Sequence, residues 1–330
     1  MNVAIISITQ QGKDISDKIT QKLQQDPQII HIKQYHKNVK DAIAESFNTY
    51  DAIIAIMASG IIIRSIAPYV TSKLSDPAVV LVDDNANHAI SLLSGHFGGA
   101  NPLTHKIADL LGADAVITTS TDVNKKTGID SIAQNYYFKL ENPKNIRYIN
   151  RALVDDRLVE LKMPHKYSYI LDDEIKKSYN ITYDDMQDTI VATVDGHDVI
   201  LTPRNVVMGI GARRDIAQAK VENAVKCACQ ILNIKPQRID SFATVDVKEN
   251  EKGILDTVAM YDKPLKIITK DEIKNFTDNE CSKSDFVMKQ FGIKGVCEPT
   301  ALLANHENSH LIFKKTAYNG VTIAVSLSDK

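Results

Sequence analysis

The segment from Ser94 to Asn101, Ser-Gly-His-Phe-Gly-Gly-Ala-Asn, contains the residue types in this chain that are best placed to do chemistry. Its three glycines permit positive φ angles and the close approach of a ligand. Asn101 followed by Pro102 predicts the N-cap and first position of a helix that ends before Gly112. The amides of Gly98 to Asn101 are then expected at the positive end of that helix, where they can bind an anion or a developing oxyanion.

His96 lies inside this loop, and the pattern also fits a tight strand-to-helix turn with a solvent-facing histidine. A second candidate is the run Thr118-Thr119-Ser120-Thr121-Asp122, which follows a short apolar segment. Its hydroxyl groups and carboxylate are expected at a strand end, where the ligands of α/β sheets bind. The alternative interpretation is that this run only caps the turn that follows.

The segment His306-Glu307-Asn308-Ser309-His310 matches the zinc-hydrolase pattern His-Glu-x-x-His. That pattern needs a helix, because only then do both histidines share one face. Here a helix beginning at Pro299 must end before a strand at Leu311, and asparagine and serine are poor helix-interior residues. The five residues are expected to form the connection, and no zinc site is predicted.

Several motifs occur in an order that resembles a known family. The sequences Met57–Pro68, Lys73, Asp76–Val80, the glycine loop and Val116–Asp122 are similar to the amino-terminal domain of the CbiG family, the cobalt-precorrin-5A hydrolases of anaerobic cobalamin biosynthesis. Three further motifs resemble the carboxy-terminal domain of that family: Gly209–Arg214, Lys248 with Glu251, and Gly295–Pro299. The family usually has Cys and Gly where this chain has Ala212 and Asp215.

The resemblance implies an enzyme that opens the ring-A δ-lactone of cobalt-precorrin-5A and releases acetaldehyde, giving cobalt-precorrin-5B. Cobalt would arrive within the substrate, so no cofactor and no protein-bound metal are expected. The expected partner is a small-molecule corrinoid, with transient contacts to neighbouring pathway enzymes. The alternatives are a non-catalytic corrinoid carrier and, third, a zinc-dependent hydrolase.

Such chemistry needs an activated water, a stabilised oxyanion and a proton transfer. His96 is the candidate general acid or base, since imidazole titrates near neutral pH and the loop is expected to leave it accessible. Asp122 is predicted to orient His96 or the water, and Glu298 is the third catalytic candidate. The predicted substrate-binding residues are Ser59, Gly60, Arg64, Lys73, Ser94, Gly95, Gly98, Gly99, Asn101, Arg213 and Arg214, with the four cations holding substrate carboxylates.

The elements that must position these residues predict an α/β fold. Short apolar runs alternate with helical patterns over the first part of the chain, which indicates a largely parallel sheet covered on both faces. The fold class expected is two α/β units with largely parallel or mixed sheets flanked by helices, joined by a smaller middle region. The predicted domains are 1–135, 136–205 and 206–330, and no chemistry is assigned to the middle region.

Local signals inside these domains are specific. Ser59 is predicted to cap a helix over 60–67, and Asp215 with Gln218 a helix after the strand at 206–210. Asp195-Gly196 and Asn319-Gly320 predict hairpins. Gly209-Ile210-Gly211 lacks the third glycine of a dinucleotide site and has an acidic residue near its place, so nucleotide binding is not expected.

Composition excludes several classes. The chain has 330 residues, 24% of them charged, and a formal net charge of -2, which argues against a general nucleic-acid surface. No apolar run reaches the roughly 18 residues of a membrane span, and no basic leader opens the chain, so a cytoplasmic location is expected. Cys227, Cys229, Cys281 and Cys297 form no Cys-x-x-Cys pair and are expected to be free thiols.

Overall fold

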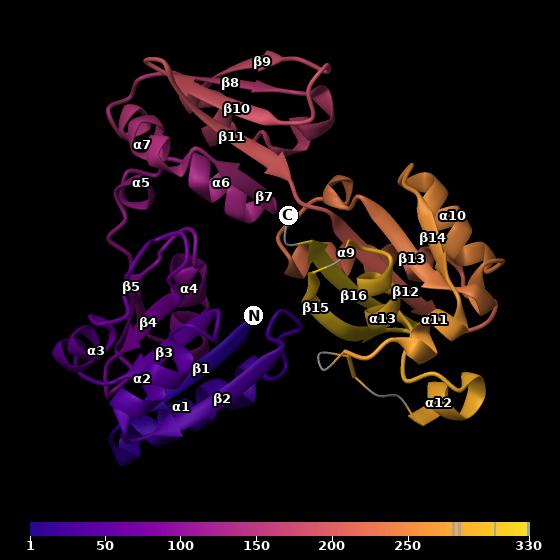
Figure 1. Ribbon diagram of the computed structural model, residues 1–330, viewed down its shortest axis with the longest axis horizontal. Coiled ribbons are helices and arrows are strands. Elements are labelled where there is room, and N and C mark those ends of the chain that lie inside the picture. Colours follow the sequence, from indigo (N-terminus) through magenta and orange to yellow (C-terminus); the bar gives the residue numbers. More distant parts are fainter. Residues whose placement is uncertain (279–280, 283–284, 307, 329–330) are drawn as a thin grey trace. The chain divides into compact units, whose positions relative to one another are not determined.

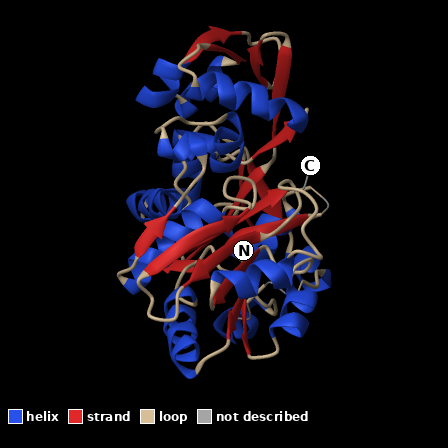
Figure 2. Cartoon of the chain, turned by 90° about the vertical axis from the view of Figure 1, so that its left-hand side faces the viewer, coloured by secondary structure: helices blue, strands red, loops and turns tan. Residues whose placement is uncertain are grey.

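The computed structural model describes residues 1–278, 281–282, 285–306 and 308–328, which form three β-sheets with helices packed beside them (Figures 1 and 2). The chain divides into two compact units. One comprises Met1–Gln134 with Leu140–Leu201, and the other comprises Asn135–Lys139 with Thr202–Lys330. Mixed sheets flanked by helices confirm the predicted α/β class, whereas the three-domain boundaries stay a prediction.

The first unit begins with a six-stranded sheet in the order β2-β1-β3-β4-β5-β6. All neighbours are parallel except β4 and β5. Every residue of β3 and β4 is buried, because helices cover both faces of the sheet. The strands are β1 (Asn2–Ser7), β2 (His31–His36), β3 (Ala52–Ile56), β4 (Ala78–Val82), β5 (His88–Leu93) and β6 (Asp114–Val116).

Helices of this unit fall on two sides of the sheet. Apolar residues of α1 and α4 share one core cluster, and those of α2 and α3 share the other. Strand β2 lies at the edge of the sheet, and its side chains are largely exposed. The helices are α1 (Gln10–Leu23), α2 (Val39–Ser46), α3 (Ser59–Ile66), α4 (Ala100–Leu111), α5 (Ser120–Val123) and α6 (Ile129–Asn135).

Three predicted helix caps are wrong. Ser59 is the first residue of α3 and Ala58 precedes it, with no side-chain cap. Gly99, at φ 84°, is the N-cap of α4, so Asn101 lies inside the first turn. The helix after β12 begins at Gln218 behind an Ala217 cap, and no capping box forms. In each case a residue with strong capping preference lies one or two positions away from the cap, because the loop before the helix fixes where the helix begins.

A five-stranded sheet, ordered β7-β11-β10-β8-β9, follows in the middle of the chain. The hairpin between β10 and β11 is as predicted, with positive φ at both Asp195 and Gly196. Helix α7 packs against β10 and presents an apolar face made of Ile146, Ile149, Ala152 and Leu153. The elements are β7 (Phe138–Glu141), η1 (Pro143–Asn145), α7 (Ile146–Val154), β8 (Val159–Met163), η2 (His165–Ile170), α8 (Asp173–Ser178), β9 (Tyr179–Tyr183), β10 (Ile190–Val194) and β11 (His197–Pro203).

The second unit contains a mixed five-stranded sheet, ordered β14-β13-β12-β16-β15. Its last two strands form the predicted hairpin at Asn319-Gly320, again with positive φ at both residues. The strands are β12 (Val206–Ala212), β13 (Ser241–Val245), β14 (Leu265–Ile268), β15 (Ser309–Tyr318) and β16 (Val321–Ser328). The helices are α9 (Gln218–Ile231), η3 (Pro236–Arg238), η4 (Asp246–Lys248), α10 (Lys252–Met260), α11 (Lys270–Asn275), α12 (Asp285–Phe291) and α13 (Cys297–Leu303).

The glycines of β12 have a packing role. A Cβ on Gly209 would lie 1.9 Å from the carbonyl oxygen of Cys297, and one on Gly211 would lie 2.5 Å from Oγ1 of Thr322. These contacts require glycine because α13 and β16 press directly on the strand. They account for the Gly-x-Gly pattern without a nucleotide. Among the described residues, no helix is both long and apolar enough to cross a membrane.

Candidate active site

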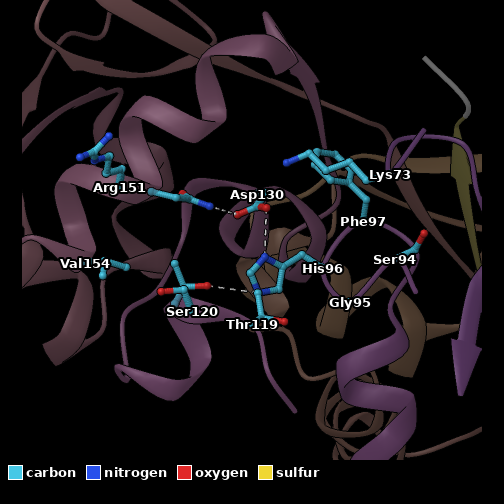
Figure 3. Close-up of a pocket in the computed structure, with 12 residues that line it drawn as sticks. Lys73, Ser94, Gly95, His96, Phe97, Thr119, Ser120, Asp130, Arg151 and Val154 are labelled. Atoms are coloured by element: carbon cyan, nitrogen blue, oxygen red, sulfur yellow. Dashed lines mark hydrogen bonds and ion pairs between the residues drawn. The ribbon is translucent and has the colours of Figure 1, made fainter. Parts of the chain in front are cut away.

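A cavity of about 410 Å³ lies in the first unit and brings together the glycine loop, the segment after β6 and helix α7. His96 occupies the centre of the lining residues, between Asp130 and the Thr119–Ser120 segment (Figure 3). The cavity is lined by Lys73, Ser94, Gly95, His96, Phe97, Thr119, Ser120, Thr121, Asp130, Asn150, Arg151 and Val154. Cations, a carboxylate and an imidazole in one hollow are the groups that acid–base chemistry on an anionic substrate requires.

His96 is held between two carboxylates. Its Nε2 lies 2.6 Å from Oδ2 of Asp122, and its Nδ1 lies 3.0 Å from Oδ2 of Asp130. The imidazole side chain is only 9% exposed, so the solvent-facing alternative is wrong, and so is the expectation of an openly accessible ring. Asp130 is 5% exposed and Asp122 is 40% exposed, so only Asp122 reaches the solvent freely.

The two carboxylates set the charge of the ring. Burial alone lowers the pKa of His96, but hydrogen bonds and charge from Asp130 and Asp122 outweigh it and raise this pKa to about 9. Burial likewise raises the pKa of Asp130, yet His96 and Asn150 bring it below its usual value. At pH 7 only about 1% of an imidazole with this pKa is neutral. His96 is therefore an imidazolium that can donate a proton, and it is poorly suited to be the initial base.

Asn101 organises the other side of the histidine. Its Nδ2 donates to Oγ1 of Thr119 and to Oδ2 of Asp122, both at 3.1 Å, while its Oδ1 accepts from Oγ of Ser91 at 2.6 Å. Asn101 is 4% exposed, which makes it a residue that fixes Asp122. A Cβ on Gly95 would lie 2.7 Å from Oδ1 of Asn101, so the loop needs glycine there. Thr119 has no side-chain capping bond to α5, and Asp122 serves the histidine, so the capping interpretation of that run is wrong.

Three of the four amides expected to receive an oxyanion are already occupied. The N–H groups of Gly99, Ala100 and Asn101 donate to the carbonyl oxygens of His96, Ser94 and Gly95, at 3.0, 3.2 and 2.9 Å. The tight loop uses these three donors internally, which counts against an oxyanion site built from them, and the role of the amide of Gly98 stays a prediction. The cations Lys73 and Arg151 on the cavity wall are the other groups suited to stabilise negative charge there.

The other loop residues shape the cavity. Ser94 and Gly95 line it, while Gly98 and Gly99 do not. Ser94 has a φ of 56° and a buried hydroxyl group without a hydrogen-bond partner. A Cβ on Gly98 would lie 2.6 Å from Cβ of Ser94, so Gly98 is required by packing.

Of the predicted residues around α3, only Lys73 lines the cavity. Ser59, Gly60 and Arg64 are absent from its walls, and a Cβ on Gly60 would lie 3.2 Å from Nη1 of Arg64. The loop that carries Lys73 is held by Asp76, which is 6% exposed and accepts hydrogen bonds from the amides of Thr71 and Ser72. Binding roles for Ser59, Gly60 and Arg64 stay predictions.

Comparison with known proteins identifies the family. The family model described as Cobalamin synthesis G N-terminal matches residues 41–122, and the model described as Cobalamin synthesis G C-terminus matches residues 206–326. A protein of Methanocaldococcus jannaschii named "Probable cobalt-precorrin-5A hydrolase" is 33% identical, over 99% of this chain and 99% of its own length. The chain belongs to the CbiG family.

Further CbiG relatives cover most of the chain. The cobalt-precorrin-5A hydrolase of Salmonella typhimurium is 32% identical over 86% of this chain and 84% of its own length. A crystal structure of a homolog of cobalamin biosynthesis protein G from Sulfolobus solfataricus is 28% identical, covers 99% of this chain and 97% of that one, and has a TM-score of 0.60. The arrangement of elements described above is therefore a CbiG fold.

Candidates in the second unit of this CbiG protein have different surroundings. Glu298 is 2% exposed, and its carboxylate accepts hydrogen bonds from the amide of Ser282 at 2.8 Å and from the amide of Lys315 at 2.9 Å. These bonds hold the 282 segment and β15 against α13 and give Glu298 a structural role within its unit. Its catalytic role stays a prediction.

Arg213 and Arg214 are both exposed in the loop after β12. Arg214 lines a second cavity, of about 680 Å³, whose other charged residues are Lys252, Asp215, Asp246, Glu249, Glu251 and Asp256. Five carboxylates against two cations oppose the binding of another carboxylate there. The predicted binding of substrate carboxylates by Arg213 and Arg214 is not tested by the structure and stays a prediction.

The possible zinc motif is not helical. Helix α13 ends at Leu303, His306 lies in an exposed loop, and His310 is the second residue of β15. Glu307 lies outside the described residues. Within the described part of the chain, no group of three metal-ligating side chains is found, and all four cysteines are free.

Sequence reasoning missed Asp130, Asn150, Arg151 and Phe97 as cavity residues. Asp130 and Asn150 lie 34 and 54 positions beyond His96 in the sequence, inside ordinary helical patterns. The one local signal was Gly128, where a Cβ would lie 2.7 Å from Oδ1 of Asp130. A glycine before a helix is too common a pattern to identify a buried carboxylate by itself.

Proposed function

We propose that this protein is a cobalt-precorrin-5A hydrolase of cobalamin biosynthesis. Membership of the CbiG family and the names of its relatives over nearly the whole chain support this function. The observation that carries it at the site is the imidazole of His96, held between Asp122 and Asp130 on the wall of a cavity that also presents Lys73 and Arg151. Neither a zinc centre nor a passive carrier is supported by the comparisons.

The proposed reaction begins with water. The exposed carboxylate of Asp122 accepts a proton from the water, and the hydroxide adds to the carbonyl carbon of the ring-A δ-lactone. Lys73 and Arg151 stabilise the negative charge on the tetrahedral oxygen. Because Asp122 is now protonated, the Nε2–H of His96 is released from it and donates a proton to the alkoxide that leaves. The lactone is thereby opened to a carboxylic acid and an alcohol, with the elements of one water molecule added.

Loss of the carbon fragment follows from that alcohol. Its hydroxyl group gives up a proton as the carbon–carbon bond to the macrocycle breaks, so the fragment leaves as acetaldehyde. The electron pair of the broken bond passes to the macrocycle, which takes up a proton to give cobalt-precorrin-5B. Asp122 and the neutral His96 left by the first step are the groups at hand to move these protons.

The proposal places all metal chemistry in the substrate. Cobalt would enter coordinated within the corrinoid, and the protein residues would bind its peripheral carboxylates and move protons. Lys73 and Arg151 are the cations of the cavity that suit such carboxylates. We also propose that the protein acts in the cytoplasm, in transient contact with the enzymes that supply and consume the corrinoid.

The decisive experiment is turnover by the purified protein. Under anaerobic conditions, cobalt-precorrin-5A is incubated with the protein, acetaldehyde is trapped as a hydrazone, and the corrinoid is analysed by mass spectrometry. We expect stoichiometric acetaldehyde and cobalt-precorrin-5B. Tight binding of the corrinoid with no acetaldehyde and an intact lactone would replace the enzyme with the carrier.

A further inference from the structure

Helix α7 belongs to the middle region, for which no chemistry is predicted from the sequence, yet it forms one wall of the cavity around His96. Three of its residues, Asn150, Arg151 and Val154, line that cavity. Its apolar face is buried and keeps the helix in place. The spacing of Asn150 and Val154, one helical turn apart, puts both on the same stripe of α7.

Both ends of the Asn150 amide are used. Its Nδ2 donates to Oδ1 of Asp130 at 2.8 Å, and its Oδ1 accepts from the amide of Ile129 at 3.1 Å. The two contacts are chemically matched, because the donor faces a carboxylate and the acceptor faces an N–H group. Asn150 therefore binds the backbone of the first turn of α6 and the carboxylate of Asp130 at the same time.

The carboxylate of Asp130 is fixed through both of its oxygens. Oδ1 accepts from Asn150 and, at 3.2 Å, from the amide of Ser131, whereas Oδ2 faces Nδ1 of His96 at 3.0 Å. With Oδ1 held, the carboxylate cannot rotate away from the imidazole without losing a buried, charge-assisted hydrogen bond. Asn150 is thus two hydrogen bonds away from the proton-donating ring.

The backbone is built to admit this contact. A Cβ on Gly128 would lie 2.7 Å from Oδ1 of Asp130 and 3.0 Å from Nδ2 of Asn150. Any larger residue there would push the amide and the carboxylate apart. Glycine at this position is an observation independent of the hydrogen bonds, and it points to the same arrangement.

We infer that Asn150 is a positioning residue of the reaction, through which the middle region sets the orientation and charge of the Asp130–His96 pair. This inference rests on the proposed function for its kinetic consequence. The other titratable or charged groups around the pair are Asp122 on α5, Lys73 on the loop after α3, Tyr179 on β9 and Arg151 on α7. None of these takes the place of the Asn150 amide, because none is within hydrogen-bond distance of Oδ1 of Asp130 among the described contacts.

Two substitutions separate positioning from folding. Asn150→Ala removes both contacts. Asn150→Asp keeps an acceptor for the amide of Ile129 but replaces the donor to Asp130 with a second carboxylate, which must share a proton with the first. The matched control is Asn145→Ala, because Asn145 precedes the same helix and donates only to the carbonyl oxygen of Asp198, at 2.9 Å. Thermal unfolding shows that each variant is folded.

The readouts are the NMR titration of His96, which needs no substrate, and steady-state acetaldehyde release. In Asn150→Ala we expect His96 to titrate at lower pH than in the wild type, because Asp130 is no longer held against the ring. In Asn150→Asp we expect it to titrate at higher pH, because the second carboxyl group adds negative charge beside the pair as its proton is lost. We expect kcat to fall about 10- to 100-fold with KM little changed, as for partners that orient a functional histidine. Asn145→Ala should match the wild type in both readouts.

An unchanged His96 titration in a folded Asn150 variant overturns the inference, whether or not the wild type turns over. Unchanged kcat in both variants, with an active wild type, overturns it as well. If the wild type releases no acetaldehyde but the His96 titration shifts as expected, the positioning role stands and the proposed function falls.

Discussion

At the scale of single residues, the decisive property is the charge on His96. The imidazole is buried, which by itself favours the neutral ring, but a carboxylate on each nitrogen reverses that preference. Asp130, nearly inaccessible, keeps its charge only because the imidazolium and the Asn150 amide face it. His96, which the sequence predicts as either a general acid or a general base, is therefore a proton donor in the protein without substrate.

Substituting His96 by Asn tests this role directly. Asn keeps a hydrogen-bonding side chain but cannot donate a titrating proton, so kcat for acetaldehyde release should fall about 10²- to 10⁴-fold. His105→Asn on the exposed face of α4, the helix that follows the loop of His96, is the control and should leave kcat unchanged. Wild-type release by His96→Asn, from about pH 6 to about pH 10, would exclude His96 as the proton donor.

The raised pKa of His96 also makes a prediction about stability. Because the folded pKa is about 9 against the ordinary 6.5, the pair stabilises the fold fully below about pH 6.5 and loses this contribution as pH rises through 9. The free energy of unfolding of the wild type, relative to His96→Asn, should drop by about 3 kcal/mol across that window. Urea titrations at several pH values measure it. A difference that stays constant with pH would show that the two carboxylates do not hold a charged ring.

At the scale of elements, close packing decides where glycine is needed. Strand β12 runs under α13 with no room for a side chain at Gly209, whose added Cβ would lie 1.9 Å from a backbone carbonyl of that helix. The same principle operates in the loop before α4, where Gly95 and Gly98 let Asn101 and Ser94 approach. Gly95 and Gly98 allow the close contacts of the loop before α4, and Gly209 allows the contact between β12 and α13. The φ angles of these three glycines are not in the left-handed region, so close packing is what requires glycine.

Gly209→Ala should therefore be strongly destabilising. The helix must move away from the sheet, exposing core between β12 and α13, and a loss of about 3 kcal/mol or more is expected, as for other overpacked cores. Gly295→Ala is the control, because its nearest non-neighbouring contact would be 3.3 Å away. Equal melting temperatures for the two variants would contradict this account of the Gly-x-Gly pattern.

At the scale of the whole molecule, the segment 135–139 belongs to the second unit although the chain around it belongs to the first. Arg238, 1% exposed, holds it there. Its guanidinium donates to the carbonyl oxygens of Tyr136, Tyr137 and Arg204 and pairs with Asp240 at 2.7 Å. A buried arginine with all these acceptors ties three stretches of chain into one unit.

Removing this side chain should release the segment. Arg238→Met removes the four hydrogen bonds of the buried guanidinium, and we expect a loss of about 3 kcal/mol or more together with faster hydrogen exchange at 135–139. Arg157→Met, which breaks an exposed pair with Asp195, should cost less than about 1 kcal/mol. Protection of 135–139 that survives in Arg238→Met would show that other contacts hold the segment.

The arginines after β12 provide a test of substrate binding by the second unit. If Arg213 and Arg214 bind substrate carboxylates, the double substitution to Ala should raise KM for cobalt-precorrin-5A, each lost contact being worth about 1.5 to 3 kcal/mol. The five carboxylates near Arg214 argue for a smaller effect from that residue than from Arg213. An unchanged KM would leave both arginines as surface residues.

The sequence by itself determined the class of fold and the two hairpins, and it predicts the loop around His96 as the site of chemistry. Alternating apolar runs, Asp-Gly and Asn-Gly turns and a glycine-rich loop all report local backbone preference and burial, which a linear pattern carries. It also placed Asp122 with the histidine, because both follow strands of one sheet.

Only the tertiary structure decided the protonation state of His96, the partners of Asn101 and the participation of Asp130 and Asn150. Each depends on groups that are 10 to 34 positions apart and meet because helices α4, α5, α6 and α7 pack around one cavity. The predicted cap at Asn101 failed for the same reason, and three of the predicted oxyanion amides are occupied within the loop. The hydrogen-bond partner of a polar group depends on which groups lie near it in the folded protein and on how deeply it is buried. A local sequence pattern indicates only which hydrogen bonds the residue is able to form.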